Sequence, residues 1–487
     1  MRISSIIPCV RNANGSGHEQ RRQTDGPGKD EVNRMNDFRK TAQEMLEFIR
    51  ISPTCFHAVA NIGRMLEAAG FQQLQEKEEW KLEKGGRYYT ERNDSSVIAF
   101  VIPEKEVGIR GFHMAAAHSD SPCFKIKEKP ELTVEEHYLR LNTEKYGGMI
   151  LSTWLDRPLS VAGRLAVKNG NGIEGRLVNI DRDLCVIPNV AIHMNREMNK
   201  GVEYNPQVDL LPLLADVSFD EYDAHTTYDA QTASENAEEQ PETVEKPTLV
   251  ALAAEAAGVD AETILGEDLF LYTRQEGKMI GAKGEFVLSP RLDDLQSAFA
   301  LTKAFTESTP AEYINLCAVF DNEEVGSGTR QGADSTFLED TLQRITEGLQ
   351  EGHSTYLRWV ADSFLISADN AHAVHPNHPE KADPANRPYL NGGIVIKFHG
   401  SQKYTTDGIS AAKMKDYCER AKAPYQTYAN RSDIAGGSTL GNISTAHVSV
   451  SSVDIGLPQL AMHSAVETAG MKDTEYAVRA LKEFWGE

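Results

Sequence analysis

The stretch Ile314–Thr329, INLCAVFDNEEVGSGT, joins a short apolar run to a group of acidic residues and then to glycines. The run Ile314–Phe320 contains small and β-branched residues, which is typical of a buried strand. The acidic group follows where that strand would end. In open α/β sheets, ligands bind at the carboxyl ends of strands. The stretch therefore predicts an α/β fold whose functional site includes Glu323 and Glu324.

Four other polar motifs lie far apart along the chain, and three of them also follow short apolar runs. They are HSD (His118–Asp120), RLDD (Arg291–Asp294), SADNAH (Ser367–His372) and MHS (Met462–Ser464). Together the motifs supply imidazoles and carboxylates, which are the ligands of hydrolytic sites with two metal ions. Such a site needs a bridging carboxylate, terminal ligands and room for water. Wide spacing is expected, because each ligand comes from the end of a different strand or loop.

The spacing within two motifs suggests separate roles for neighbouring residues. An imidazole that binds a metal ion usually donates its other N–H to a carboxylate, and Asp120 lies within reach of His118. Adjacent side chains diverge, so one of Glu323 and Glu324 can bind metal while the other serves as general base.

On these motifs the chain resembles the aspartyl aminopeptidase family of dinuclear zinc metallopeptidases, from about Phe38 to near the C-terminus. The resemblance implies that one ion is bound by His118 and Asp369, the other by Glu324 and His463, and both by Asp293. It also implies that Glu323 is the general base, that Asp120 orients His118, and that His193 stabilises the oxyanion in a neighbouring subunit. Zn²⁺ is the expected metal, and Mn²⁺ or Co²⁺ would also suit these ligands.

The same resemblance predicts hydrolysis of the N-terminal residue of peptides, with an acidic residue preferred. Lys403 is the predicted cation for that residue, and Asp433 and His375 are predicted to lie on the substrate side. Two alternatives remain open. The first is a carboxypeptidase or N-acyl amino acid deacylase with the same metal ligands. The second is a weakly active, self-assembling shell protein, against which the intact Glu323 and ligand set argue.

Changes in residue composition and hydrophobic pattern along the chain predict two domains and a tail. Residues 36–120 and 289–487 are predicted to form a catalytic α/β domain with a doubly wound mixed sheet. Residues 121–288 read as an inserted β-rich domain with an acidic loop at about 216–246, and the resemblance implies that it forms dimers and a tetrahedral dodecamer. Residues 1–35 read as a disordered tail or a misassigned start.

The composition limits the classes of partner. The 487 residues include 50 basic and 72 acidic side chains, and the net charge of −22 argues against nucleic acid and anionic membranes as partners. No apolar stretch approaches the length of a transmembrane helix. The 6 cysteines show no regular spacing, which favours reduced thiols and a cytoplasmic location.

Overall fold

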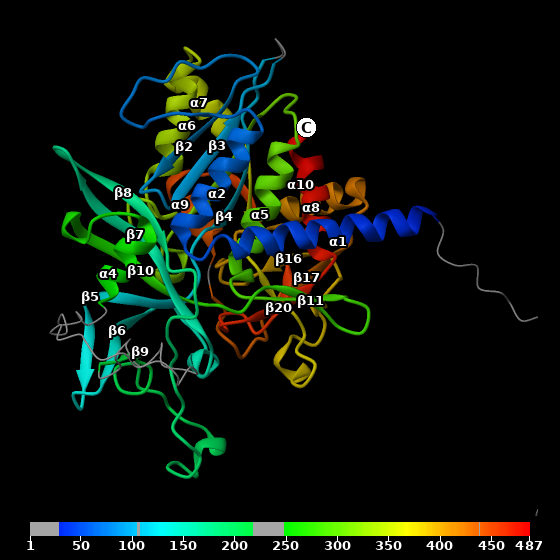
Figure 1. The fold of residues 1–487 in the computed structure, drawn as a ribbon. Coiled ribbons are helices and arrows are strands. Elements are labelled where there is room, and N and C mark those ends of the chain that lie inside the picture. Colours follow the sequence, from blue (N-terminus) through cyan, green and yellow to red (C-terminus); the bar gives the residue numbers. More distant parts are fainter. Residues whose placement is uncertain (1–28, 105–107, 218–247, 438) are drawn as a thin grey trace, which may run out of the picture.

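The computed structural model describes residues 29–104, 108–217, 248–437 and 439–487, which form a mixed α/β fold with three sheets (Figure 1). The largest sheet has nine strands. Across that sheet the strands follow the order β1 (Gln72–Gln73), β2 (Arg87–Arg92), β3 (Ser96–Val101), β13 (Ile314–Phe320), β4 (Phe112–His118), β14 (Phe364–Ala368), β18 (Ser451–Gly456), β16 (Ile394–Phe398) and β17 (Tyr425–Ala429).

The centre of this sheet is parallel. Strands β13, β4, β14 and β18 run side by side in the same direction, while β3 and β16 pair antiparallel to them on either side. Every residue of β4, β13 and β14 is buried. Short runs of small and branched apolar residues therefore form strands that are covered on both faces.

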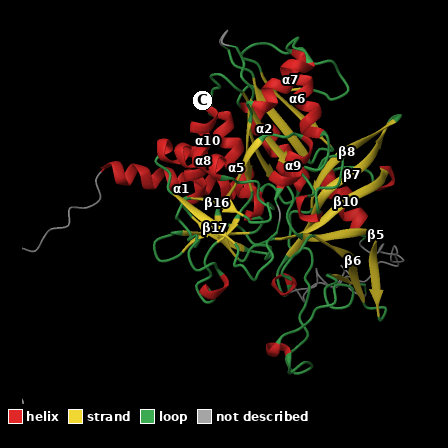
Figure 2. Ribbon diagram, turned by 180° about the vertical axis from the view of Figure 1, so that it is seen from behind, coloured by secondary structure: helices red, strands yellow, loops and turns green. Residues whose placement is uncertain are grey.

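Helices cover both faces of the large sheet, as Figures 1 and 2 show from opposite sides. One face packs against α1 (Lys29–Arg50), α2 (Cys55–Ala68), α5 (Leu292–Thr306), α8 (Gly408–Ala421) and α10 (Asp473–Trp485). The other face packs against α6 (Phe337–Gly348), α7 (His353–Ala361) and α9 (Leu440–His447). In α6 the buried residues Phe337, Leu338, Thr341, Leu342 and Ile345 recur at helical spacing.

A second, antiparallel sheet of six strands lies beside the large sheet (Figure 1). Its order is β8 (Gly172–Asn179), β7 (Leu159–Asn169), β10 (Ile264–Thr273), β5 (Cys123–Val134), β6 (Tyr138–Tyr146) and β9 (Leu213–Asp216). The helix α4 (Leu249–Ala257) contributes Leu249 and Ala253 to the core of this unit. The predicted acidic loop at 216–246 lies almost entirely outside the described residues.

A third sheet links distant parts of the chain. Its order is β11 (Lys278–Ile280), β12 (Phe286–Ser289), β20 (Glu467–Gly470), β19 (Pro458–Leu460) and β15 (Ala371–His372). Strand β11 and all but the last residue of β12 fall within the predicted insertion, yet β12 pairs with β20 near the C-terminus. The helix α1 begins at Lys29, so its first residues fall within the segment 1–35 predicted to be a disordered tail or a misassigned start. No helix among the described residues is long and apolar enough to cross a membrane.

Candidate metal centre

The central parallel strands bring three of the polar motifs to one edge of the large sheet. Strand β4 ends at His118, whose partner in the neighbouring β13 is Phe320, the residue just before the Asp-Asn-Glu-Glu group. Strand β14 lies on the other side of β4 and ends just before Asp369. Parallel neighbours end at the same edge, so His118, Glu323 and Asp369 collect there.

Asp293 lies between the two histidines, with one carboxylate oxygen toward each. His118 Nε2 is 3.7 Å from Asp293 Oδ1, and His463 Nε2 is 3.4 Å from Asp293 Oδ2. Glu324 Oε1 lies 3.5 Å from the same nitrogen of His463. Two ligands of one tetrahedral zinc ion are about 3.3 Å apart, given bonds of about 2.0–2.1 Å. Asp293 therefore has the geometry of a bridge between two ions.

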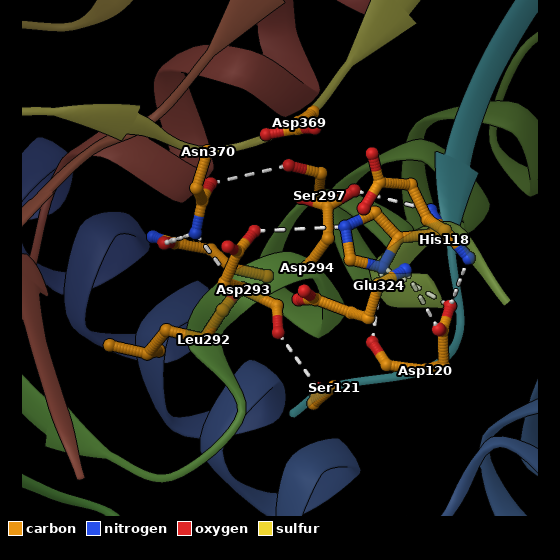
Figure 3. A network of polar contacts seen from close by, with 12 residues as sticks. His118, Asp120, Ser121, Leu292, Asp293, Asp294, Ser297, Glu324, Asp369 and Asn370 are labelled. Carbon is orange, nitrogen blue, oxygen red and sulfur yellow. Dashed lines mark hydrogen bonds and ion pairs between the residues drawn. The ribbon is translucent and has the colours of Figure 1, made fainter. Parts of the chain in front are cut away.

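Two carboxylate oxygens in this cluster have no hydrogen-bond partner. Asp293 Oδ1 and Glu324 Oε1 are buried and accept no hydrogen bond from the described residues. Buried polar atoms nearly always have a partner, and a cation is the natural one here. Two groups of side chains bring their ligand atoms close enough to share an ion, namely His118–Glu323–Glu324 and Asp293–Glu324–His463. The residues present thus fit divalent metal ions, and Figure 3 shows His118, Asp293 and Glu324 close together, with Asp369 drawn above them.

The carboxylates of the cluster crowd one another without enough positive charge between them. Burial raises the pKa of Glu323 to about 7, and Asp369 and Asp120 add to the increase. Burial and the neighbouring Asp293 also raise the pKa of Glu324 well above its usual value. Divalent cations would remove this repulsion and hold both groups in their ionised form.

Asp120 fixes the doubled glutamate as well as the histidine. Its Oδ1 accepts a hydrogen bond from the backbone N–H of Glu323 and its Oδ2 from that of Glu324, both at 3.1 Å. The Tyr146 hydroxyl donates to the same Oδ2 at 2.8 Å. His118 Nδ1 lies 3.0 Å from the backbone oxygen of Asp120 and 3.5 Å from its Oδ1. Asp120 therefore connects His118 to the Glu323–Glu324 turn, and Tyr146 was not among the predicted residues.

A cavity of about 350 Å³ opens next to the cluster. Its lining includes Asp293, Glu323, Asp369, Lys397, Tyr404 and His463. Lys397, in β16, is 2% exposed, and its Nζ donates to Asp369 Oδ1 at 3.1 Å. Lys397 was not among the predicted residues, although a lysine inside the apolar run IVIKF is a visible signal. A buried lysine needs a counter-charge, and Asp369 provides it.

The three predicted substrate-side residues lie outside the lining of this cavity. Lys403 Nζ donates to the backbone oxygen of Gly436 at 2.9 Å. Asp433 is exposed and forms an ion pair with Arg431 at 2.7 Å. His375 is exposed and lines a separate hollow. Their predicted roles in substrate binding gain no support from these positions.

His193 is exposed on the segment between β8 and β9, which extends away from the sheets (Figure 1). It belongs to neither group of close ligand atoms in its own subunit. Large apolar side chains on the same segment are also exposed, including Val190, Ile192 and Met194.

Known proteins share both the sequence and the fold. A family model described as aminopeptidase I zinc metalloprotease (M18) matches residues 48–485. A probable M18 family aminopeptidase 2 of Clostridium novyi is 46% identical over 448 residues, covering 92% of this chain and 98% of that protein. Its counterpart in Pseudomonas putida is 40% identical and covers 91% and 97%.

Solved structures give the same result. The cryo-EM structure of the Ape4 and Nbr1 complex matches with a TM-score of 0.85 and 36% identity, covering 92% of this chain and 86% of that one. The structure of the Saccharomyces cerevisiae mApe1 dodecamer matches with a TM-score of 0.76 and 26% identity, covering 92% and 97%. With the metal-binding geometry already described, these matches show that the chain belongs to the M18 family of zinc metalloproteases and is a metal-dependent aminopeptidase.

Proposed function

We propose that this aminopeptidase removes an N-terminal aspartate or glutamate from peptides at a pair of divalent metal ions, with Glu323 as the general base. The proposal of two metal ions is supported by the position of Asp293, which directs one carboxylate oxygen toward His118 and the other toward His463. A centre with a single ion would need only one of these contacts.

The proposed ligands divide between two positions. One is formed by His118, Asp369 and Asp293, and the other by Glu324, His463 and Asp293. Bound ions would polarise the scissile carbonyl and activate water for attack. Mixed nitrogen and oxygen ligands suit Zn²⁺, and Mn²⁺ and Co²⁺ are compatible with the same set.

Glu323 is the carboxylate placed to transfer protons. It lines the cavity beside Asp293 and Asp369, and its backbone N–H is held by Asp120. An ionised carboxylate in this position can accept a proton from water and return it to the leaving amine nitrogen. The turn that carries both glutamates keeps Glu323 facing the substrate while Glu324 binds metal.

Lys397 is the cation that we assign to acidic specificity, in place of Lys403. Among the described residues that line the cavity, it is the only lysine or arginine. Burial opposes its charge, but Asp369 raises the pKa of Lys397, so that the ammonium stays protonated. The carboxylates around it attract the substrate's free amine, and the ammonium attracts a carboxylate in the substrate's first side chain.

We also propose that the chain assembles into dimers and a dodecamer. The yeast mApe1 structure is named as a dodecamer. The exposed apolar side chains around His193, of which Met194 is 82% exposed, would then be covered by a neighbouring subunit. In such an assembly His193 would reach the partner's site and donate a hydrogen bond to the oxyanion.

The test is a substrate panel. Chromogenic amides of aspartate, glutamate and leucine are compared with N-acetyl amino acids, before and after chelation and after return of Zn²⁺, Mn²⁺ or Co²⁺. We expect metal-dependent cleavage of the acidic amides with kcat/KM well above that for the leucyl amide, and no cleavage of the N-acetyl compounds. A preference for leucine would refute the acidic assignment.

A further inference from the structure

Glu467 holds two of the proposed metal ligands through their backbones. It is the first residue of β20, is 2% exposed, and belongs to none of the five polar motifs. Its Oε2 accepts a hydrogen bond from Asp293 N at 3.0 Å, and its Oε1 accepts one from His463 N at 2.7 Å. One buried carboxylate thus connects a residue at the start of α5 to a residue in the loop between β19 and β20.

His463 depends on this contact more than Asp293 does. Its φ is 66°, a left-handed conformation that costs a non-glycine residue free energy and persists only when neighbours hold it. His463 is also 31% exposed at its side chain, whereas Asp293 is 3% exposed and its carbonyl accepts a hydrogen bond from Ser121 Oγ at 2.8 Å. Apart from the contacts of its Nε2 with Asp293 and Glu324, the ring is held by a 2.7 Å contact between His463 Nδ1 and the Gly148 carbonyl. The His463 carbonyl accepts a hydrogen bond from Ile150 N at 2.9 Å.

We propose that Glu467 is a positioning residue that fixes His463 against Asp293 and so controls filling of the metal position shared by His463, Glu324 and Asp293. The proposal rests on the dinuclear centre proposed above. It adds that the two positions respond differently. Both share Asp293, but of the two histidines only His463 is held by Glu467, whereas His118 and Asp369 lie at the ends of β4 and β14.

Glu467→Gln tests this role with almost no change in shape. Both carboxylate oxygens face N–H donors, so an amide can accept from only one of them and must turn its own N–H₂ toward the other. Loss of a contact that orients a metal ligand lowers metal affinity by about 10- to 100-fold. We expect that weakening for one of the two ions per subunit and nearly unchanged affinity for the other.

Asp473→Asn is the matched control. Asp473 is also fully buried, and it also accepts hydrogen bonds from two backbone N–H groups, those of Asn391 at 2.7 Å and Gly393 at 2.9 Å. Asp473 does not line the metal cavity and does not belong to either group of close ligand atoms. The same chemical change there should lower the thermal stability of the metal-free protein but leave both metal affinities as they are.

The experiment is calorimetric titration of the metal-free protein with Zn²⁺, together with titration by Co²⁺ followed through its visible spectrum. If Glu467→Gln does not fold, Glu467→Asp takes its place. This change keeps the charge but shortens the side chain, and it should lower the affinity for the same ion. The role of Glu467 would be overturned if the wild-type protein binds two ions and the Glu467→Gln variant binds both with the same affinities. Equal weakening of both ions would overturn the selective effect, and wild-type protein that binds no ion would remove the metal centre and this inference together.

Discussion

Replacement of Lys397 by methionine separates acidic specificity from general activity. Methionine keeps an unbranched side chain of similar volume and removes the ammonium. Lys397 is 2% exposed and forms an ion pair of 3.1 Å with Asp369, so the change affects a buried charge. Two effects follow. Asp369 loses its partner for every substrate, and an acidic substrate also loses the proposed partner of its side chain.

The magnitude comes from the second effect. Removal of one member of a buried charge pair typically costs about 2–5 kcal/mol, which is about 30- to 5,000-fold in kcat/KM. That loss should fall only on the aspartyl and glutamyl amides. The disturbance at Asp369 lowers all rates by a common factor, which cancels in the ratio of kcat/KM for aspartyl and leucyl amides.

The assay is therefore that ratio, measured for the wild type, Lys397→Met and Lys403→Met. We expect the ratio to fall by at least about 30-fold for Lys397→Met. Lys403 serves as the control because its Nζ donates to the Gly436 carbonyl, outside the cavity. An unchanged ratio in Lys397→Met would refute the reasoning, and a collapsed ratio in Lys403→Met would return the role to that lysine.

Three further substitutions test the remaining assignments. Glu323→Gln should keep both metal ions and lower kcat by about 10²- to 10⁴-fold, because the general base is lost while the metal ligands remain. A turnover near that of the wild type would exclude Glu323 as the general base. Asp293→Ala should reduce metal content after dialysis more than any other single ligand change, because both ions share that carboxylate; a stoichiometry near two would place the bridge elsewhere. His193→Phe should lower turnover by about 100-fold without loss of metal, and activity should return in mixed assemblies with Glu323→Gln subunits. If the mixtures show only the sum of the parent rates, His193 does not act in a neighbouring subunit.

The sequence alone was enough to predict the mixed α/β fold and where its strands would end. The runs before His118, Asp321 and Asp369 are short, apolar and followed by polar residues, and each forms a buried strand of the large sheet. Such runs are local signals, because a strand covered on both faces cannot tolerate exposed polar groups. Family membership followed from the same residues and is confirmed by the match over residues 48–485.

The residues that contact the predicted metal ligands could not be derived from local sequence patterns. Lys397 looks like part of a strand and Lys403 like a free loop cation, yet the register of β16 buries Lys397 beside Asp369. Glu467 carries no sequence signal, since its partners are backbone N–H groups of Asp293 and His463. The packing of distant segments decides which lysine reaches the cavity. It also decides which carboxylate holds two ligands together. Local patterns in the chain carry no information about those distances, and only the tertiary structure determines them.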